Sequence, residues 1–206
     1  MISLRLANTP TSILIIICCI STNPCTPIGQ AKLAREAGLS NNTVAHNYID
    51  ILSDSGCIIP AYPWDQHKNI PILRKECKYH FTNLLVALAY HPARIRRPKD
   101  FLSLPETEQG AWYEWLVAQE LSRRTAISNE NLLAPKLFWQ NKHHEIGFVS
   151  NNNQFIEVKR GSTYALEFSW FVKQFPQKQL TVINQQAFST ALVKGQTFAS
   201  YLKAHS

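Results

Sequence analysis

The sequence predicts an α/β protein in two parts: a group of three helices, then an α/β sandwich built on a mixed sheet. Two observations lead to this prediction. Apolar residues recur at helical spacing over roughly the first sixty positions. From about residue 105 onward, short apolar strands alternate with helices, which is typical of layered α/β domains. The expected parts are residues 1–64 for the helical part, 65–104 for a basic junction and 105–206 for the sandwich.

The composition is sufficient for a folded core. Of 206 residues, 45% are apolar, including 10 Phe, 7 Tyr and 5 Trp. A chain of this length forms one large domain or two small ones. The formal net charge of +7 is compatible with a polyanionic partner such as DNA, although many basic proteins bind none. Five cysteines with neither a CxxC pair nor zinc-finger spacing favour reduced thiols and a cytoplasmic location.

The apolar run at residues 13–20 has two interpretations. It follows Arg5, much as the apolar region of a secretory signal peptide follows a basic residue. No small-residue cleavage pattern follows it cleanly, however, so a buried helix is the preferred interpretation. The run is also too short to cross a bilayer, and no membrane partner is expected.

The next two helices are expected at residues 28–37 and from residue 43 onward. Gly38 supplies the stop of the first, and Ser40 is placed to cap the second. Two helices joined by Gly-Leu-Ser, the second polar at its beginning, are typical of a helix-turn-helix. Residues 57–64 then indicate a strand entering a wing. The apolar stripe expected on the second of these helices comprises Val44, Tyr48, Ile51 and Leu52.

A helix-turn-helix indicates DNA binding through the second helix, with basic side chains of the first on phosphates. The candidate contacts are Lys32, Arg35, Asn42 and His46. No Lys or Arg lies within the second helix, which is unusual for a DNA reader. The alternative is therefore a helical trio that packs or docks a partner.

The junction holds the densest basic cluster of the chain. It comprises Arg94, Arg96, Arg97 and Lys99. The cluster is interpreted either as a set of phosphate contacts or as a solvated loop. The remaining elements expected are a strand at 79–81, a helix at 84–89, a long helix at 109–124, strands at 137–139, 145–149 and 155–159 with a turn at 150–153, a strand at 180–183 and a helix at 198–203.

Glu114 is a carboxylate within an apolar helical stripe. An ionised carboxylate costs several kcal/mol to bury unless it is paired or bound to a metal. Lys159 on the adjoining sheet is the expected partner. If no metal binds, Glu114→Gln is expected to be tolerated. The neighbours of Glu114 on the helix surface are Gly110, Ala111, Val117, Ala118 and Leu121.

Glu157 and Lys159 share one face of their strand, because strand side chains alternate between faces. A Glu and a Lys on a strand that faces an acidic helix suit metal-assisted hydrolysis of a phosphodiester. Carboxylates hold Mg²⁺, and the lysine steadies the nucleophile or the developing charge. Glu114, Glu157 and Lys159 are the candidate catalytic residues, and Glu157 and Glu145 the candidate metal ligands. The alternative is a buried Glu–Lys bridge retained in a scaffold.

Several short motifs occur in a fixed order along most of the chain. They are Leu33-Ala-Arg-Glu-Ala-Gly-Leu-Ser40 with Thr43, Val44 and Tyr48; Lys78-Tyr-His-Phe81 with Asn83 and Leu84; Gly110-Ala-Trp-Tyr-Glu114 with Val117, Ala118, Glu120 and Leu121; Trp139; Glu145-Ile-Gly-Phe148; and Ile156-Glu-Val-Lys159. Together they resemble the C-terminal region of prokaryotic AAA-type ATP-binding proteins, in which a winged helix precedes a PD-(D/E)XK nuclease-like domain.

The resemblance implies a winged helix-turn-helix followed by a restriction-endonuclease-like sandwich, with Glu114 as the helix carboxylate and Glu157 and Lys159 as the strand motif. Gly147 stands where the family has its metal-binding aspartate, and Asn83 where an aspartate is common.

The ATPase half of that family is missing, since no GxxxxGK(S/T) phosphate loop occurs in the chain. The chain resembles a separated C-terminal region, with residues 1–10 as an improvised start. The function expected is a non-catalytic, nucleic-acid-associated or partner-binding module with a degenerate nuclease-like site. The alternatives are a Mg²⁺-dependent nuclease and a protein-binding adaptor that docks onto a separate ATPase subunit.

Overall fold

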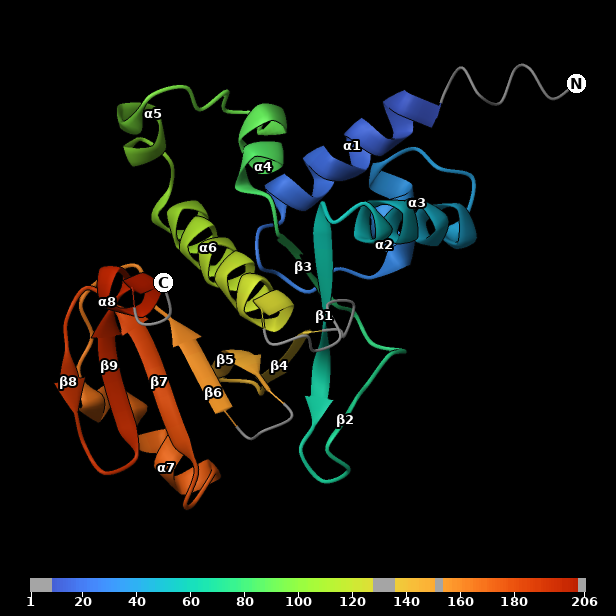
Figure 1. The fold of residues 1–206 in the computed structure, drawn as a ribbon. Helices are drawn as coiled ribbons and strands as arrows, with labels where there is room; N and C mark the ends of the chain where they lie inside the picture. Colours follow the sequence, from blue (N-terminus) through green and yellow to red (C-terminus); the bar gives the residue numbers. More distant parts are fainter. Residues whose placement is uncertain (1–8, 128–135, 151–153, 204–206) are drawn as a thin grey trace, which may run out of the picture.

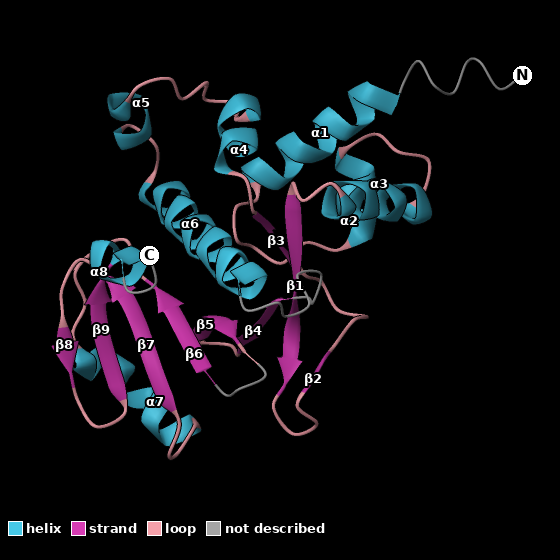
Figure 2. Cartoon of the chain, in the orientation of Figure 1, coloured by secondary structure: helices cyan, strands magenta, loops and turns pink. Residues whose placement is uncertain are grey.

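Strands from both predicted parts join one mixed sheet, which confirms the α/β class. The computed structural model describes residues 9–127, 136–150 and 154–203. Most of the expected N-terminal start (1–8) and of the expected turn (151–153) lies outside these residues. The strands run in the order β2-β1-β4-β5-β6-β7-β9-β8, with β3 paired to β1 (Figures 1 and 2). Their bounds are β1 (Ile58–Asp65), β2 (Ile70–Pro71), β3 (Lys78–Phe81), β4 (Lys136–Gln140), β5 (Glu145–Val149), β6 (Gln154–Val158), β7 (Gln179–Asn184), β8 (Phe188–Ser189) and β9 (Val193–Thr197).

Every helix whose residue range was predicted from the sequence is present. The structure also contains α5, η1 and α7, for which no range was predicted. The helices are α1 (Thr9–Thr22), α2 (Gln30–Glu36), α3 (Asn42–Asp54), α4 (Leu84–Tyr90), α5 (Pro98–Leu102), α6 (Glu106–Ile127), the 3-10 turn η1 (Ala165–Phe168), α7 (Ser169–Gln174) and α8 (Phe198–Lys203). No helix among the described residues has the length and apolar character needed to cross a bilayer.

The turn between α2 and α3 forms at the predicted place. Gly38 follows the end of α2 with φ +64°, a left-handed conformation that favours glycine. The cap of α3 is Asn41 and not Ser40, because the Asn41 side chain accepts a hydrogen bond from the Val44 backbone N at 3.0 Å. The local sequence therefore stops one helix and starts the next within a few residues.

The apolar stripe predicted for α3 is wrong in detail. The buried residues are Ala45, Ile49 and Leu52, which follow the spacing of one helix face. Ile51 is 49% exposed. Leu52 of the predicted stripe is buried and Tyr48 packs against the core, but the fully buried Ala45 was not predicted.

β1 connects the helical part to the sandwich. It pairs antiparallel with β3 and the short β2, and parallel with β4, where Tyr62 is opposite Leu137. The sheet thus runs across the boundary expected at residue 64. The helical core also crosses the boundary expected at residue 104, since Ile16, Ile20 and Trp115 of α6 belong to one buried cluster. Residues 13–20 form part of a helix, as predicted; Ile16, Ile17 and Ile20 are buried, but Leu14 and Ile15 are exposed.

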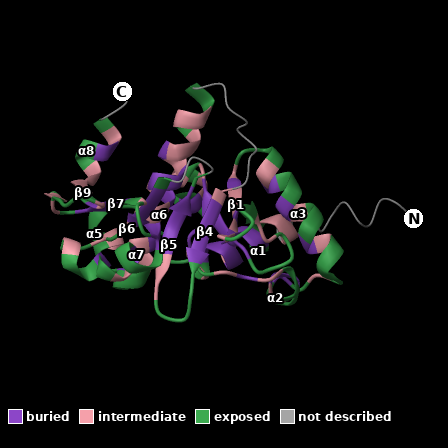
Figure 3. Ribbon diagram, turned by 90° about the horizontal axis from the view of Figure 1, so that it is seen from below, coloured by how far each residue is buried: buried purple, intermediate pink, exposed green. Residues whose placement is uncertain are grey.

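Helices cover both faces of the C-terminal strands. On one face, Val117 and Ala118 of α6 pack with Phe148 and Ile156. On the other face, aromatic residues of η1 and α7 pack on Phe155 and its neighbours. The middle of β4 and most of β5 are buried between these layers (Figure 3). Residues that alternate along β6 therefore face different helices.

Position 195 in β9 has room only for glycine, because an aromatic ring on the neighbouring strand occupies the space of a Cβ atom. Gly195 pairs with Phe188 of β8, and a Cβ at position 195 would lie 2.3 Å from the Phe188 ring. Gly195→Ala is therefore expected to displace this ring and lower the free energy of unfolding by about 1–3 kcal/mol. Urea denaturation would measure the loss. Gly161→Ala is the matched control, because nothing lies within 4 Å of its Cβ position. Equal stability of the two variants would contradict the prediction.

Candidate functional site

A buried lysine lies at the centre of the candidate site. Lys78 of β3 has a fully buried side chain, and its Nζ lies between two carboxylates. It donates to Glu114 Oε1 of α6 at 3.3 Å and to Glu145 Oε1 of β5. Strand β3, helix α6 and strand β5 thus contribute one side chain each. The site combines a lysine and two acidic groups that are distant in the sequence.

The predicted pairing of Glu114 with Lys159 is wrong. Glu114 Oε1 contacts Lys78 and, at 2.9 Å, His80 Nε2, while Lys159 Nζ lies 2.7 Å from Glu157 Oε1. Alternation along β6 explains the difference. Glu157 and Lys159 are in phase with Phe155, on the face covered by α7, whereas α6 covers the face of Ile156.

Lys78 and His80 are functional candidates that the sequence interpretation missed. They occupy alternate positions of β3, so both project toward α6. Both side chains are fully buried. The signal available in the sequence was this spacing of two polar residues within a strand otherwise composed of Tyr79 and Phe81.

The Glu114–Lys78 pair is ionised at neutral pH. Burial alone would raise the pKa of Glu114, but Lys78 and the hydrogen bond with His80 lower it to about 2. Burial would likewise lower the pKa of Lys78, yet Glu114 and Glu145 hold it well above its usual range. Each charge therefore depends on the other for compensation.

Glu157 behaves in the opposite way. Burial raises its pKa to about 7, against the attraction of Lys159. The carboxylate is enclosed, whereas the Lys159 side chain is 46% exposed and stays largely hydrated. Glu157 Oε2 also accepts a hydrogen bond from the Gly147 backbone N at 2.9 Å. Near neutral pH, Glu157 is close to half-protonated.

Gly147 lies between the two groups of charges. Its backbone N contacts Glu157, while a Cβ at this position would lie 3.7 Å from Glu114 Oε1. A side chain at this position would therefore meet the Glu114 carboxylate. Glycine itself contributes no ligand atom.

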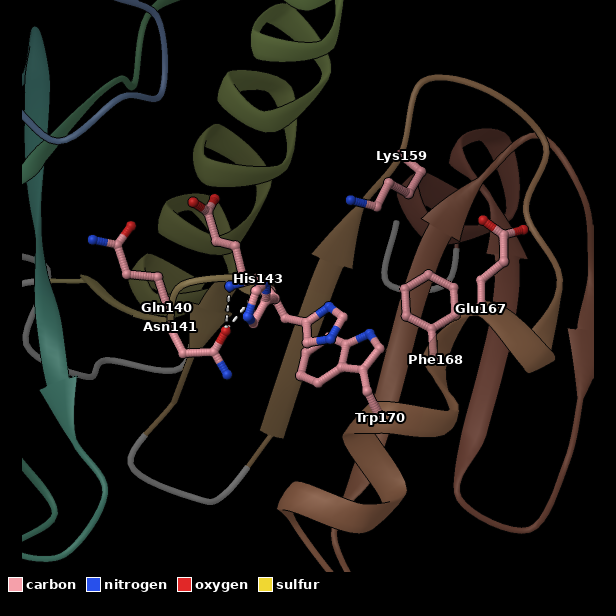
Figure 4. A pocket seen from close by; sticks show the side chains of 9 residues that line it. Gln140, Asn141, His143, Lys159, Glu167, Phe168 and Trp170 are labelled. Atoms are coloured by element: carbon pink, nitrogen blue, oxygen red, sulfur yellow. Dashed lines mark hydrogen bonds between the residues drawn. The ribbon is translucent and has the colours of Figure 1, made fainter.

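Lys159 opens into a surface pocket of about 420 Å³ (Figure 4). Glu145 also lines this pocket, which connects it to the Lys78 cluster. One wall is aromatic: the rings of His144 and Trp170 lie parallel, with centroids 4.3 Å apart. The sequence interpretation missed this wall. The other lining residues are Gln140, Asn141, His143, Glu167 and Phe168.

The candidate nucleic-acid contacts form two separate sets. On α2 and α3, Arg35 and Asn42 are exposed, Lys32 lies 3.7 Å from Glu36, and His46 lies 3.5 Å from Asp50. The second set lies around α5, at the opposite end of the molecule from α3 (Figures 1 and 3). The two sets are not brought together in one surface.

The basic cluster of the junction surrounds a second pocket. Arg94, Arg96 and Arg97 line a space of about 590 Å³ together with Asp100. Arg97 is paired with Asp100 at 3.2 Å, and all four basic side chains of the cluster, including Lys99, are exposed. Arg94 and Arg96 thus give the pocket a positive charge that suits a phosphate.

Comparisons with family models, curated proteins and solved structures found no match for this chain. A function is therefore inferred from the geometry of the site itself.

Proposed function

We propose that the chain is a non-catalytic, nucleic-acid-associated module, with a winged helix-turn-helix joined to a restriction-endonuclease-like sandwich whose hydrolytic site is degenerate. The observation that carries the proposal is the position of Lys78. Its ammonium group contacts both Glu114 and Glu145, the carboxylates available to a divalent cation. An internal cation thus takes the electrostatic role that Mg²⁺ has in a metal-dependent nuclease.

Magnesium would bind weakly beside this lysine. Mg²⁺ needs carboxylate and water oxygens in near-octahedral geometry. Glu114 and Glu145 are poor ligands because they already contact Lys78. Glu157 is a poor ligand because it is close to half-protonated near pH 7. Two like unit charges about 4 Å apart repel by about 4 kcal/mol at an effective dielectric constant of 20, and a divalent ion is repelled by about twice as much. The missing carboxylate at Gly147 removes the ligand that would offset this repulsion.

Nucleic-acid association is supported by the charge of the exposed groups. The chain carries a net charge of +7. Arg94 and Arg96 line one pocket, and Lys159 opens into another that has an aromatic wall. Phosphates and bases are recognised by basic groups beside aromatic rings. A cytoplasmic location accompanies this proposal, since all five cysteines are free thiols.

DNA binding measured by fluorescence anisotropy over a range of salt concentrations tests the proposal. Affinity is expected to fall with salt, with a slope of about −0.9 per phosphate contact for duplex DNA. The double variant Arg94→Gln/Arg96→Gln should show a shallower slope. Lys68→Gln/Lys173→Gln is the control, because it removes the same charge from exposed positions elsewhere.

Two outcomes would reject the proposed function. Plasmid cleavage with Mg²⁺ or Mn²⁺ that Lys159→Ala abolishes would establish the alternative of an active nuclease. Failure to bind DNA at any salt concentration, together with co-purification with an ATPase, would instead favour the adaptor that docks onto a separate subunit.

Gly147→Asp is expected to create the missing cation site. The new carboxylate would lie between Glu114 and Glu157 and raise the local negative charge. Without metal, this variant should be less stable than the wild type, and saturating Mn²⁺ should restore part of the loss. A ligand at about 100 times its Kd stabilises the folded state by about 2.7 kcal/mol.

Thermal unfolding with and without Mn²⁺ measures this effect. The wild type and the control Gly161→Asp, whose Cβ position is open, should not respond. An Mn²⁺ response in the wild type equal to that of Gly147→Asp would show that Lys78 does not keep an oxygen-liganded ion away from Glu114 and Glu145, contrary to the proposal.

A further inference from the structure

Three potential metal ligands from distant segments meet beside the Lys78 pair. The Cys25 Sγ, a ring nitrogen of His80 and a carboxylate oxygen of Glu114 all lie within 4.8 Å of one another. Cys25 belongs to the loop after α1, His80 to β3 and Glu114 to α6. We propose that these three side chains bind a zinc ion, which ties the N-terminal loop to the sheet and to α6.

The donor set is that of zinc and not of magnesium. Thiolate, imidazole and carboxylate are the three protein ligand types of Zn²⁺, whereas Mg²⁺ prefers oxygen alone. Zinc–ligand lengths of about 2.0–2.3 Å place tetrahedral ligand atoms roughly 3.3–3.8 Å apart. The His80 Nε2–Glu114 Oε1 pair, now at 2.9 Å, would open slightly to admit the ion, and the Cys25 Sγ, which lies within 4.8 Å of both, would complete the set. Three protein ligands leave the fourth position of the ion to water.

His80 is incompletely satisfied without an ion. Its side chain is fully buried, and its Nε2 lies 2.9 Å from Glu114 Oε1. Its Nδ1 is buried and has no hydrogen-bond partner among the residues that the structure describes. Nε2, which faces Glu114, is therefore the ring nitrogen available to the ion, and the geometry of the three ligand atoms carries the proposal.

The charges around the cluster accommodate the ion. When all are ionised, three carboxylates face two ammonium groups, which leaves one negative charge. A divalent ion whose binding releases the Cys25 proton to solvent adds one positive charge and brings the sum to zero. The thiolate offsets the repulsion of the neighbouring lysine that opposes Mg²⁺. The groups counted are Glu114, Glu145, Glu157, Lys78 and Lys159.

Cys25 has an uncommon backbone conformation and a thiol that is hard to ionise. Its backbone has φ 52°, in the left-handed region that residues other than glycine seldom adopt. Burial, and then Glu114, raise the pKa of its thiol well above the usual range. The free thiol is therefore protonated at neutral pH, and zinc must displace that proton. Zinc affinity should accordingly decrease as the pH falls.

Titration of the full chain with Zn²⁺ and with Co²⁺ tests the proposal. One equivalent of either ion is expected to bind, and Co²⁺ should produce a thiolate-to-metal charge-transfer band. Cys25→Ser should lose that band and the Zn²⁺-dependent rise in Tm. Cys57→Ser is the control, since Cys57 is a partly buried thiol outside the cluster, and it should retain both.

X-ray absorption at the zinc edge of the wild-type protein answers the same question if Cys25→Ser does not fold. One sulfur at about 2.3 Å is expected beside nitrogen and oxygen ligands. Absence of zinc binding, a zinc shell without sulfur, or a charge-transfer band that survives in a folded Cys25→Ser protein would overturn the proposal.

Discussion

Replacement of Lys78 by methionine is expected to lower the free energy of unfolding by about 3–5 kcal/mol. Methionine fills similar space but leaves Glu114 buried opposite a neutral side chain. The carboxylate would retain His80 as its hydrogen-bond partner and lose its main counter-charge. Removal of one partner of a buried ion pair is costly because it leaves the other charge buried and uncompensated, even where the intact pair adds little net stability.

Denaturation of matched variants measures this effect. Lys75→Met is the control. It removes an exposed lysine that lies three residues before Lys78, outside β3, and should change stability little. Glu114→Gln, which the sequence alone suggested would be tolerated, is now expected to destabilise because Lys78 loses a partner. The double variant Lys78→Met/Glu114→Gln should recover part of the loss. If the loss of unfolding free energy in the double variant equalled the sum of the losses in the two single variants, the interaction between Lys78 and Glu114 would be contradicted.

The pH dependence of the wild type follows from the same pair. The pKa of Glu114 falls from 4.5 to about 2 on folding. A carboxyl group with a lowered pKa stabilises the folded state fully above its unfolded value, so the contribution of Glu114 is present above about pH 4.5 and is lost toward pH 2. In Lys78→Met, the difference from the wild type should therefore shrink as the pH is lowered through this range.

Glu157→Gln is expected to stabilise the protein at alkaline pH. The pKa of Glu157 rises from 4.5 to about 7 on folding. A raised carboxyl pKa means that its contribution to stability is present below pH 4.5 and is lost as the pH rises through 7. At pH 8 the charged form costs about 3 kcal/mol, at about 1.4 kcal/mol for each pH unit. Glutamine avoids this cost and can still accept the hydrogen bond from Gly147.

Unfolding free energies at pH 5 and pH 8 test this prediction. The advantage of Glu157→Gln over the wild type should grow with pH. Glu106→Gln is the control, because Glu106 is 85% exposed and its ion pair with Arg160 is hydrated. A Glu157→Gln protein that is less stable than the wild type at both pH values would show that the ion pair with Lys159 outweighs burial.

Most of the elements could be predicted from the sequence, because their signals are local. Gly38 ends a helix through its own backbone freedom, and alternation alone places Glu157 and Lys159 on one strand face. The strand at residues 57–64 was also predicted. Its parallel pairing with β4 was not, because pairing depends on residues far along the chain.

The centre of the site could not be predicted, for a physical reason. Lys78 follows Lys75 in a basic stretch, and its spacing from His80 is the one feature that distinguishes it from a hydrated lysine. Which face of β6 is covered by α6 is decided by tertiary packing, so Lys159 appeared to be a suitable partner for Glu114. Cys25 carried no spacing signal, since it joins His80 and Glu114 only in the folded chain.

The parallel pairing of β1 with β4 has a consequence for how the chain folds. This pairing places Tyr62 opposite Leu137, so the long segment between them must close into a loop before the two strands can pair. High contact order of this kind slows folding, and the entropy of closure is recovered only when the sheet is complete. We therefore expect the pairing of β1 with β4 to form late in folding.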